Sequence, residues 1–279
     1  VPALKVDAER AWTQLTTIAA FGPRPSGSPA MKEQLAYLEA QVKAMGYTPE
    51  RDSFTDETPS GPIEFHNLLA RLKGQRPGFI LLAAHYDTKR IDGVPDFIGA
   101  NDGASGTALL LELMRTLKSQ GTWAGPEIRF AFFDGEECQV EFGPKDGFHG
   151  SRHLAGAWKR SGELKDGLGM ILLDMIGDAD LKLTLSTEDS PELVRLVRQV
   201  AKQQGIGERV GFYGGEVWDD HTAFLERGLP AVDLIDFDYG PNNSYWHTNQ
   251  DTVEHCQAAS LEMVGNLVLG MLANWSTKP

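Results

Sequence analysis

The segment IRFAFFDGEE, residues 128–137, joins an apolar run directly to a group of acids. The run that begins at Ile128 has the composition of a strand covered on both faces of a sheet. It ends in Asp134 and, after one glycine, in the adjacent pair Glu136 and Glu137. Neighbouring carboxylates repel each other, so we expect a function that makes this pair useful at the end of its strand.

Strands and helices alternate along the rest of the chain. Apolar runs predict strands over 64–74, 79–87, 127–137, 169–180 and 230–236. Helical periodicity and capping residues predict helices over 8–21, 29–45, 103–121, 150–160, 190–205, 219–228 and 258–275. This alternation is typical of the α/β class, and we expect a three-layer α/β/α sandwich around a mixed, mostly parallel sheet.

The composition narrows the choice of partners and of compartment. The 279 residues contain no internal repeat and no long Ser/Pro linker, so we expect one domain over 1–279, acting as a monomer. The net charge of −13 disfavours binding to nucleic acid, and no apolar run is long enough to span a membrane. The start at Val1 rather than at Met favours a periplasmic or secreted protein. Cys138 and Cys256 are too few for a disulfide framework, and we expect both thiols to be free.

The expected strands end in residues that could bind a metal. In such sheets ligands bind beyond the carboxyl ends of the strands, and we place Asp233 at one of these ends. The other candidates there and in the adjoining loops are His85, Asp87, Asp102, Glu136, Glu137, Asp174, Asp219, His221 and His247. Carboxylates and imidazoles without cysteine suit a catalytic zinc site. Only one of the two adjacent glutamates can easily face the metal, so we predict Glu137 as a ligand and Glu136 as a general acid and base. We expect His221 to be a helix-start or packing residue rather than a ligand.

Several segments carry a resemblance to a known family. AAHYDTK, GANDGASGTALLLEL, FAFFDGEEC, DGFHGSRHLA, ILLDMIG, WDDHTAFLERGLPAV and YWHTNQDT resemble the glutaminyl-peptide cyclotransferases of the animal type and their bacterial relatives. That family belongs to the zinc aminopeptidase-like enzymes with an α/β/α sandwich. The resemblance implies a single zinc ion and a reaction on peptide or protein N-termini, in which N-terminal glutamine becomes pyroglutamate and ammonia is released.

The resemblance also implies roles for individual residues. Asp102, Glu137 and His247 would bind zinc, and Glu136 would move the proton. Asp174 and Asp219 would belong to the catalytic acid network, and Trp246 would line the substrate pocket. Trp218 and Phe142 are further pocket candidates, and Phe237 or Tyr239 could supply another pocket aromatic.

One departure and two alternatives stay open. Where the family has a histidine that partners Asp219, this chain has Asp233, and two acids share a hydrogen bond only if one is protonated or a cation lies between them. A dinuclear zinc aminopeptidase would use His85 and Asp174 with Asp102 for a second metal, and this sequence has all the ligands it needs. A member that only binds peptides, without catalysis, is the third reading.

Overall fold

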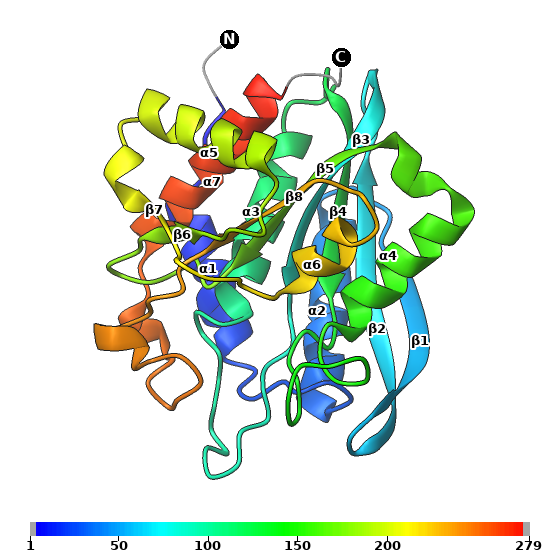
Figure 1. Cartoon of the computed structure of the whole chain (residues 1–279), viewed down its shortest axis with the longest axis vertical. Helices are drawn as coiled ribbons and strands as arrows, with labels where there is room; N and C mark the ends of the chain where they lie inside the picture. Colours follow the sequence, from blue (N-terminus) through cyan, green and yellow to red (C-terminus); the bar gives the residue numbers. More distant parts are fainter. Residues whose placement is uncertain (1–3, 276–279) are drawn as a thin grey trace.

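A six-stranded mixed sheet forms the centre of the molecule in the computed structural model, which describes residues 4–275 (Figure 1). The strands are β1 (Glu50–Thr58), β2 (Gly61–Leu72), β3 (Arg76–His85), β4 (Pro126–Phe133), β5 (Gly167–Asp174) and β8 (Ala231–Ile235), in the order β1-β2-β4-β3-β5-β8. β1 pairs with β2 and β2 with β4 in antiparallel fashion, and the other three pairings are parallel. The prediction of a mixed, mostly parallel sheet is therefore confirmed.

Helices cover both faces of this sheet. One face packs against α1 (Ala8–Ala19), α2 (Pro29–Ala44), α3 (Ala104–Lys118), α5 (Pro191–Gln203) and α7 (Ala258–Asn274). The other packs against α4 (His149–Ser161) and α6 (Asp220–Leu225). The remaining elements are the short pair β6 (Leu183–Leu185) and β7 (Val210–Phe212) and the 3-10 helices η1 (Glu163–Asp166), η2 (Gly207–Arg209), η3 (Pro241–Asn243) and η4 (Val253–His255). The three-layer sandwich expected from the sequence is present.

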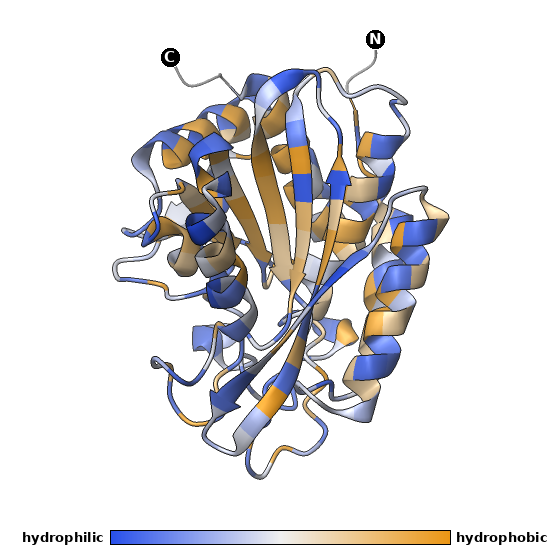
Figure 2. Ribbon diagram, turned by 90° about the vertical axis from the view of Figure 1, so that its right-hand side faces the viewer, coloured by the Kyte–Doolittle hydropathy of each residue, from blue (hydrophilic) through white to orange (hydrophobic). Residues whose placement is uncertain are grey.

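The two layers of helices explain the continuous apolar strands. Along β4, Phe130 and Phe132 face the larger helical layer, while Ala131 and Phe133 face α4 and α6. All four side chains are buried, as expected for a strand covered on both faces. Figure 2 shows the same pattern as orange central strands, with more polar residues on the edge pair β1 and β2.

Local signals place the helices where the sequence predicted them. The side chain of Asp7 accepts a hydrogen bond from the backbone N–H of Arg10 and caps α1, and Ser28 caps α2 by accepting from the N–H of Met31. Such caps satisfy N–H groups that have no partner inside the helix.

The structure corrects four expectations about the strands. The edge strand β1 was not predicted, because its sequence ERDSFTDET is mostly polar and exposed. β2 begins at Gly61 rather than at residue 64, since its first residues pair with β1 in a hairpin. Asp233 lies in the middle of β8, beside Leu172 of β5, and not at the end of the strand. The short pair β6 and β7 was also not predicted.

The structure also bears on the expectations about the cysteines and membrane spans, whereas the expectation of a single domain is not tested. Cys138 and Cys256 are both buried and free, as expected. Within residues 4–275, no helix combines the length and the apolar character needed to cross a membrane. The expectation of one domain over 1–279 includes seven terminal residues outside the described part, and it stays a prediction.

Candidate active site

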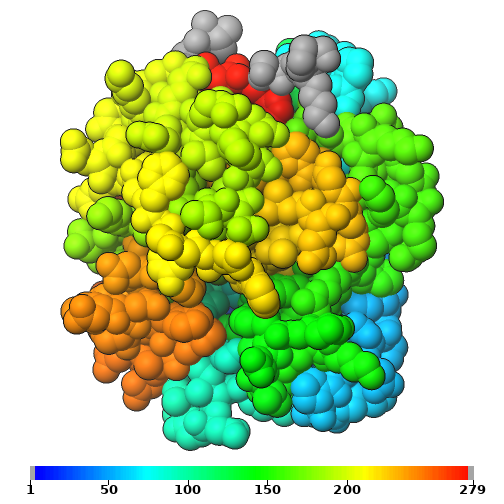
Figure 3. All heavy atoms as spheres, viewed as in Figure 1, coloured from blue at the N-terminus to red at the C-terminus, as the bar shows by residue number. Residues whose placement is uncertain are grey.

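The acids and histidines of interest gather where the parallel strands end. His85 is the last residue of β3 and Asp174 the last of β5, while Glu136 and Glu137 follow β4. Asp174 and the two glutamates line a cavity. Figure 3 shows a recess in the surface where the yellow, orange and green segments meet. The cavity has a volume of about 330 Å³, and its wall includes Asp102, Glu136, Glu137, Asp174, Asp219, Trp246 and His247.

Three of the predicted ligands converge on one point. His247 Nε2 lies 3.2 Å from Glu137 Oε1 and 3.3 Å from Asp102 Oδ2. One ligand atom from each of the three residues lies within 4.8 Å of the others. Two carboxylates and one imidazole form a donor set that zinc accepts in catalytic sites, where a further position stays open for substrate. The structure thus places Asp102, Glu137 and His247 together, and their role as ligands stays a prediction.

A second group shares Asp102 with the first. His85 Nε2 lies 3.1 Å from Asp174 Oδ1 and 3.3 Å from Asp102 Oδ1. One ligand atom from each of these three residues again lies within 4.8 Å of the others. The ring is almost fully buried. The chain can therefore present ligands for a second ion, as the aminopeptidase alternative requires.

The charges in the first group fit a bound cation. Burial acts to raise the pKa of Asp102, but its hydrogen bonds to His247 and His85 outweigh that effect and lower it. Burial acts in turn to lower the pKa of His247, but the charge of Glu137 and the hydrogen bond to Asp102 raise it to about 9. Without a metal, the imidazolium therefore balances the carboxylates. A divalent metal would displace that proton and supply the positive charge instead.

Two further aspartates hold the loops that carry these ligands. Asp87 accepts hydrogen bonds from the backbone N–H groups of Glu136 and Glu137, at 3.1 and 3.2 Å. Asp251 accepts from the N–H of Asn101 at 2.7 Å and from that of Asp102 at 3.0 Å. The sequence singled out Asp87 as a possible ligand, but the structure gives it this supporting role. Asp251 was missed, although it stands only four residues after His247.

The loop before α3 needs its glycine. Gly103 has φ +88°, and an added Cβ would lie 2.6 Å from the carbonyl oxygen of Asp87 and 3.1 Å from Cε1 of His85. Any other residue here would collide with the backbone of Asp87, whose carboxylate holds the N–H groups of the two glutamates. Asp102 is thereby held against both histidines.

Glu136 lies beside the predicted ligands with its side chain on the cavity. Burial raises the pKa of its carboxyl well above the ordinary value, and the charges of Glu137 and Asp219 raise it further. A cation bound to Glu137 would offset the effect of the Glu137 charge on this pKa. Glu136 then has the environment of a general acid and base, a carboxyl whose affinity for protons is increased by burial.

Aromatic residues line the same cavity as the acids. Trp246 stacks on His247 with 4.0 Å between the ring centres and packs edge-on against Phe237. Phe142 and the half-exposed Trp218 also line the cavity. Of the two further aromatic candidates, Phe237 lines the cavity, whereas Tyr239 is fully buried and donates its hydroxyl to Asp251.

One cation at the site was not expected from the sequence. Lys89 Nζ lies 3.1 Å from Glu137 Oε2 and donates to the carbonyl oxygen of Cys138 at 2.8 Å. It therefore neutralises the carboxylate oxygen of Glu137 that faces away from His247. Lys89 follows the strand residue His85 by only four positions, but nothing in its local sequence indicates the contact.

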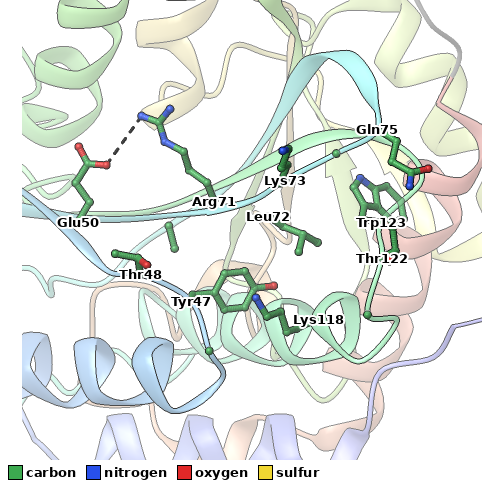
Figure 4. A pocket seen from close by; sticks show the side chains of 14 residues that line it. Tyr47, Thr48, Glu50, Arg71, Leu72, Lys73, Gln75, Lys118, Thr122 and Trp123 are labelled. Carbon is green, nitrogen blue, oxygen red and sulfur yellow. Dashed lines mark ion pairs between the residues drawn. The ribbon is translucent and has the colours of Figure 1, made fainter.

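A larger pocket lies at the opposite edge of the sheet. It has a volume of about 760 Å³ and is lined by residues from the start of β1, the ends of β2 and α3, and the loops beside them (Figure 4). Tyr47, Lys118 and Trp123 point into it, and Glu50 pairs with Arg71 at its margin at 4.0 Å. It brings together none of the expected site residues, so the smaller cavity is the candidate active site.

A mixed α/β sheet with acids and histidines at the carboxyl ends of its strands defines the class of metal-dependent α/β enzymes. Comparison with known proteins specifies the family. The model of peptidase family M28 matches residues 67–272. The glutaminyl-peptide cyclotransferase-like protein of Bos taurus is 32% identical over 90% of this chain and 72% of its own length.

Solved structures agree with this result. The glutaminyl cyclase of an Acidobacteriales bacterium is 36% identical, with a TM-score of 0.93 over 98% of this chain and 96% of that one. A Zn-dependent exopeptidase from Parabacteroides distasonis is 26% identical, with a TM-score of 0.85 over 97% and 99% of the two chains. The chain belongs to peptidase family M28 and, within it, to the glutaminyl-peptide cyclotransferases.

Proposed function

We propose that this chain is a zinc-dependent glutaminyl-peptide cyclotransferase, an acyltransferase that converts the N-terminal glutamine of peptides into pyroglutamate and releases ammonia. The observation that carries the proposal is the position of Glu136, a buried carboxyl on the same small cavity as the Asp102–Glu137–His247 group. The family relationship supports the same activity. Cyclisation needs a proton carrier near both nitrogen atoms of one residue, and the cavity is large enough for a single side chain.

The reaction divides between the metal and the side chains. A zinc ion held by Asp102, Glu137 and His247 would polarise the γ-carboxamide carbonyl and stabilise the negative charge that develops on its oxygen. Glu136 accepts a proton from the α-amino nitrogen as this nitrogen attacks the carboxamide carbon. This attack closes the ring. Glu136 then donates that proton to the carboxamide nitrogen, whose bond to the same carbon breaks as the carbonyl re-forms, and the nitrogen leaves as ammonia. Trp246 and Phe237 exclude water from the glutamine side chain.

A raised proton affinity suits both halves of this task. A carboxyl with an ordinary pKa would be a poor acid for ammonia at neutral pH, whereas a group that burial makes more basic can accept and return a proton. Asp219, one of the charges that raise the pKa of Glu136, lines the same cavity. Asp174 also lines the cavity and is paired with His85. We propose that both acids tune Glu136.

The number of ions separates this proposal from its alternative. We propose one zinc at the catalytic position. The second candidate function is a dinuclear aminopeptidase that hydrolyses N-terminal residues. The His85–Asp102–Asp174 group favours it, because this group could hold a second ion. In the cyclase, His85 and Asp174 would remain paired with each other without a metal.

Mass spectrometry of a short peptide that begins with glutamine tests the activity. We expect the zinc-loaded protein to remove one ammonia and leave the chain length unchanged. A matched peptide that begins with leucine should stay intact. Release of the first residue from either peptide would contradict the proposal and indicate the aminopeptidase.

Three further points complete the proposal. We propose that the chain acts as a monomer, since one chain supplies the whole cavity wall. We also propose one catalytic domain and a periplasmic or secreted location, where pyroglutamate caps protect exported peptides. Light scattering during gel filtration and fractionation of the source cells test the oligomeric state and the location.

A further inference from the structure

A third group of possible metal ligands adjoins the catalytic cavity, whose wall includes one of its members, Asp219. Asp219 is the residue before α6, His221 lies in its first turn, and Asp233 is in β8. One ligand atom from each residue lies within 4.8 Å of the others. This group shares no residue with the two groups at the cavity, and the expected family roles assign it no metal.

Strand geometry explains why Asp233 faces α6. Side chains alternate along β8, so that Val232 and Leu234 enter the core of the larger helical layer, while Ala231 packs on the opposite side with Phe224 of α6. Asp233 lies on the same side as Ala231, at a position where the strand would otherwise present another apolar residue. Its exposed fraction is 0%.

Most polar atoms of this group have no partner among the described residues beyond the contact between the carboxylates of Asp219 and Asp233. Both carboxylate oxygens of Asp233, both ring nitrogens of His221 and Oδ2 of Asp219 are buried without a hydrogen bond. The other oxygen of Asp219 accepts from the N–H of Asp220 and caps α6. A buried polar atom without a partner costs about 1–3 kcal/mol, and a charged one costs more. So many such atoms around one point indicate a missing ligand rather than strain in a single side chain.

The surrounding charges make that ligand a cation. Asp174 and Asp189 both act on Asp233, and His221 Nε2 lies 3.9 Å from Asp189 Oδ1. None of the lysines or arginines of the described residues forms an ion pair with Asp219, Asp233 or Asp189. Two buried carboxylates this close need a positive charge or a shared proton.

We propose that Asp219, His221 and Asp233 bind a divalent cation of the zinc class, separate from the catalytic ion. Oδ2 of Asp219, one nitrogen of His221 and the two oxygens of Asp233 provide four donors, the number that a closed structural zinc site uses. An imidazole ligand favours zinc over calcium or magnesium, which prefer oxygen ligands alone. The ion would tie α6 to β8 directly behind Glu136. This inference does not depend on the reaction that the cavity catalyses.

Metal analysis of the full-length protein tests the proposal. After loading with zinc and dialysis against metal-free buffer, we expect two zinc ions per chain by mass spectrometry. Asp233→Asn should lose one of them, His247→Ala should lose the other, and the double variant should lose both. His85→Asn is the control for the alternative second site and should keep two.

Two outcomes would overturn the proposal. One is a wild-type protein with a single zinc that His247→Ala removes, which would mean a proton shared by Asp219 and Asp233. The other is a second zinc that is lost in His85→Asn and kept in Asp233→Asn. Anomalous diffraction from wild-type crystals at the zinc edge gives a result that does not depend on the folding of Asp233→Asn. A peak between Asp219 and Asp233 is expected, and an empty position there would refute the site.

Discussion

Asp251 holds the backbone of Asp102 by accepting the N–H of that residue at 3.0 Å, and it accepts the N–H of Asn101 with its other oxygen at 2.7 Å. A carboxylate from the loop after His247 thus fixes the loop before α3. Asp102 and His247, two of the three proposed zinc ligands, are therefore linked through Asp251 as well as through the metal. Outer contacts of this kind orient ligands and influence metal affinity.

Asp251→Asn should weaken zinc binding. An asparagine can accept only one of the two N–H bonds, and its amide group would face the second N–H as a competing donor. We expect the dissociation constant for zinc to rise about 10- to 100-fold, as for other changes to groups that support metal ligands. Competition with a fluorescent chelator measures this constant. Asp96→Asn, the same change at an exposed position, is the control, and equal affinities in the two variants would contradict the supporting role.

Glu136→Gln should separate proton transfer from metal binding. The amide keeps the shape of the side chain but cannot carry the proton, so kcat should fall by about 10²–10⁴-fold while zinc content stays unchanged. Glu137→Gln should instead lose zinc, because it removes a ligand. Glu141→Gln changes an exposed glutamate of the neighbouring loop and should behave like the wild type. Wild-type turnover in Glu136→Gln would refute the proposed mechanism.

The sequence was sufficient for the central strands and for most of the site. β3, β4 and β5 are apolar on both faces, and a histidine or an acid ends or follows each of them, so their direction already places His85, Asp174 and the glutamates on one edge. The loops that complete the site were found through motifs: Asp102 stands in a glycine-rich turn and His247 beside Trp246.

The remaining features depend on tertiary contacts. β1 is polar on an exposed edge and is defined by its pairing with β2, which leaves no periodic signal. Lys89 reaches Glu137 across a loop, and no spacing in the sequence encodes that contact. His221 was expected to be a packing residue, and its burial agrees. Its unpaired ring nitrogens near Asp233 could be recognised only in three dimensions.

Trp246→Leu should weaken substrate binding more than metal binding. The indole lines the cavity and stacks on His247, so its loss removes apolar contact with the glutamine side chain. We expect kcat/KM to fall about tenfold, mainly through KM, which corresponds to about 1.4 kcal/mol. Steady-state kinetics with zinc analysis of the same sample separates the two effects. Phe212→Leu alters an exposed aromatic residue outside the cavity and should leave both parameters unchanged.

Asp236 should make the stability of the protein depend on pH. Burial raises the pKa of its carboxyl from 3.8 to about 7, although the N–H groups of Lys182 and Asp238 donate to it. Between these values the folded chain binds more protons than the unfolded chain, so the free energy of unfolding falls as the pH rises. Above about pH 7 the carboxyl is ionised in both states and this contribution is constant.

Asp236→Asn removes that titration. The difference in the free energy of unfolding, wild type minus variant, should fall by roughly 4 kcal/mol between about pH 4 and pH 7, at 1.36 kcal/mol per pKa unit. Denaturant titrations of both proteins at several pH values, with saturating zinc, measure it. Asp238→Asn removes a charge from the exposed residue two positions away and corrects for net charge alone. A difference that stays constant, or that grows with pH, would mean that the buried carboxyl of Asp236 remains ionised throughout, stabilised by its two backbone donors.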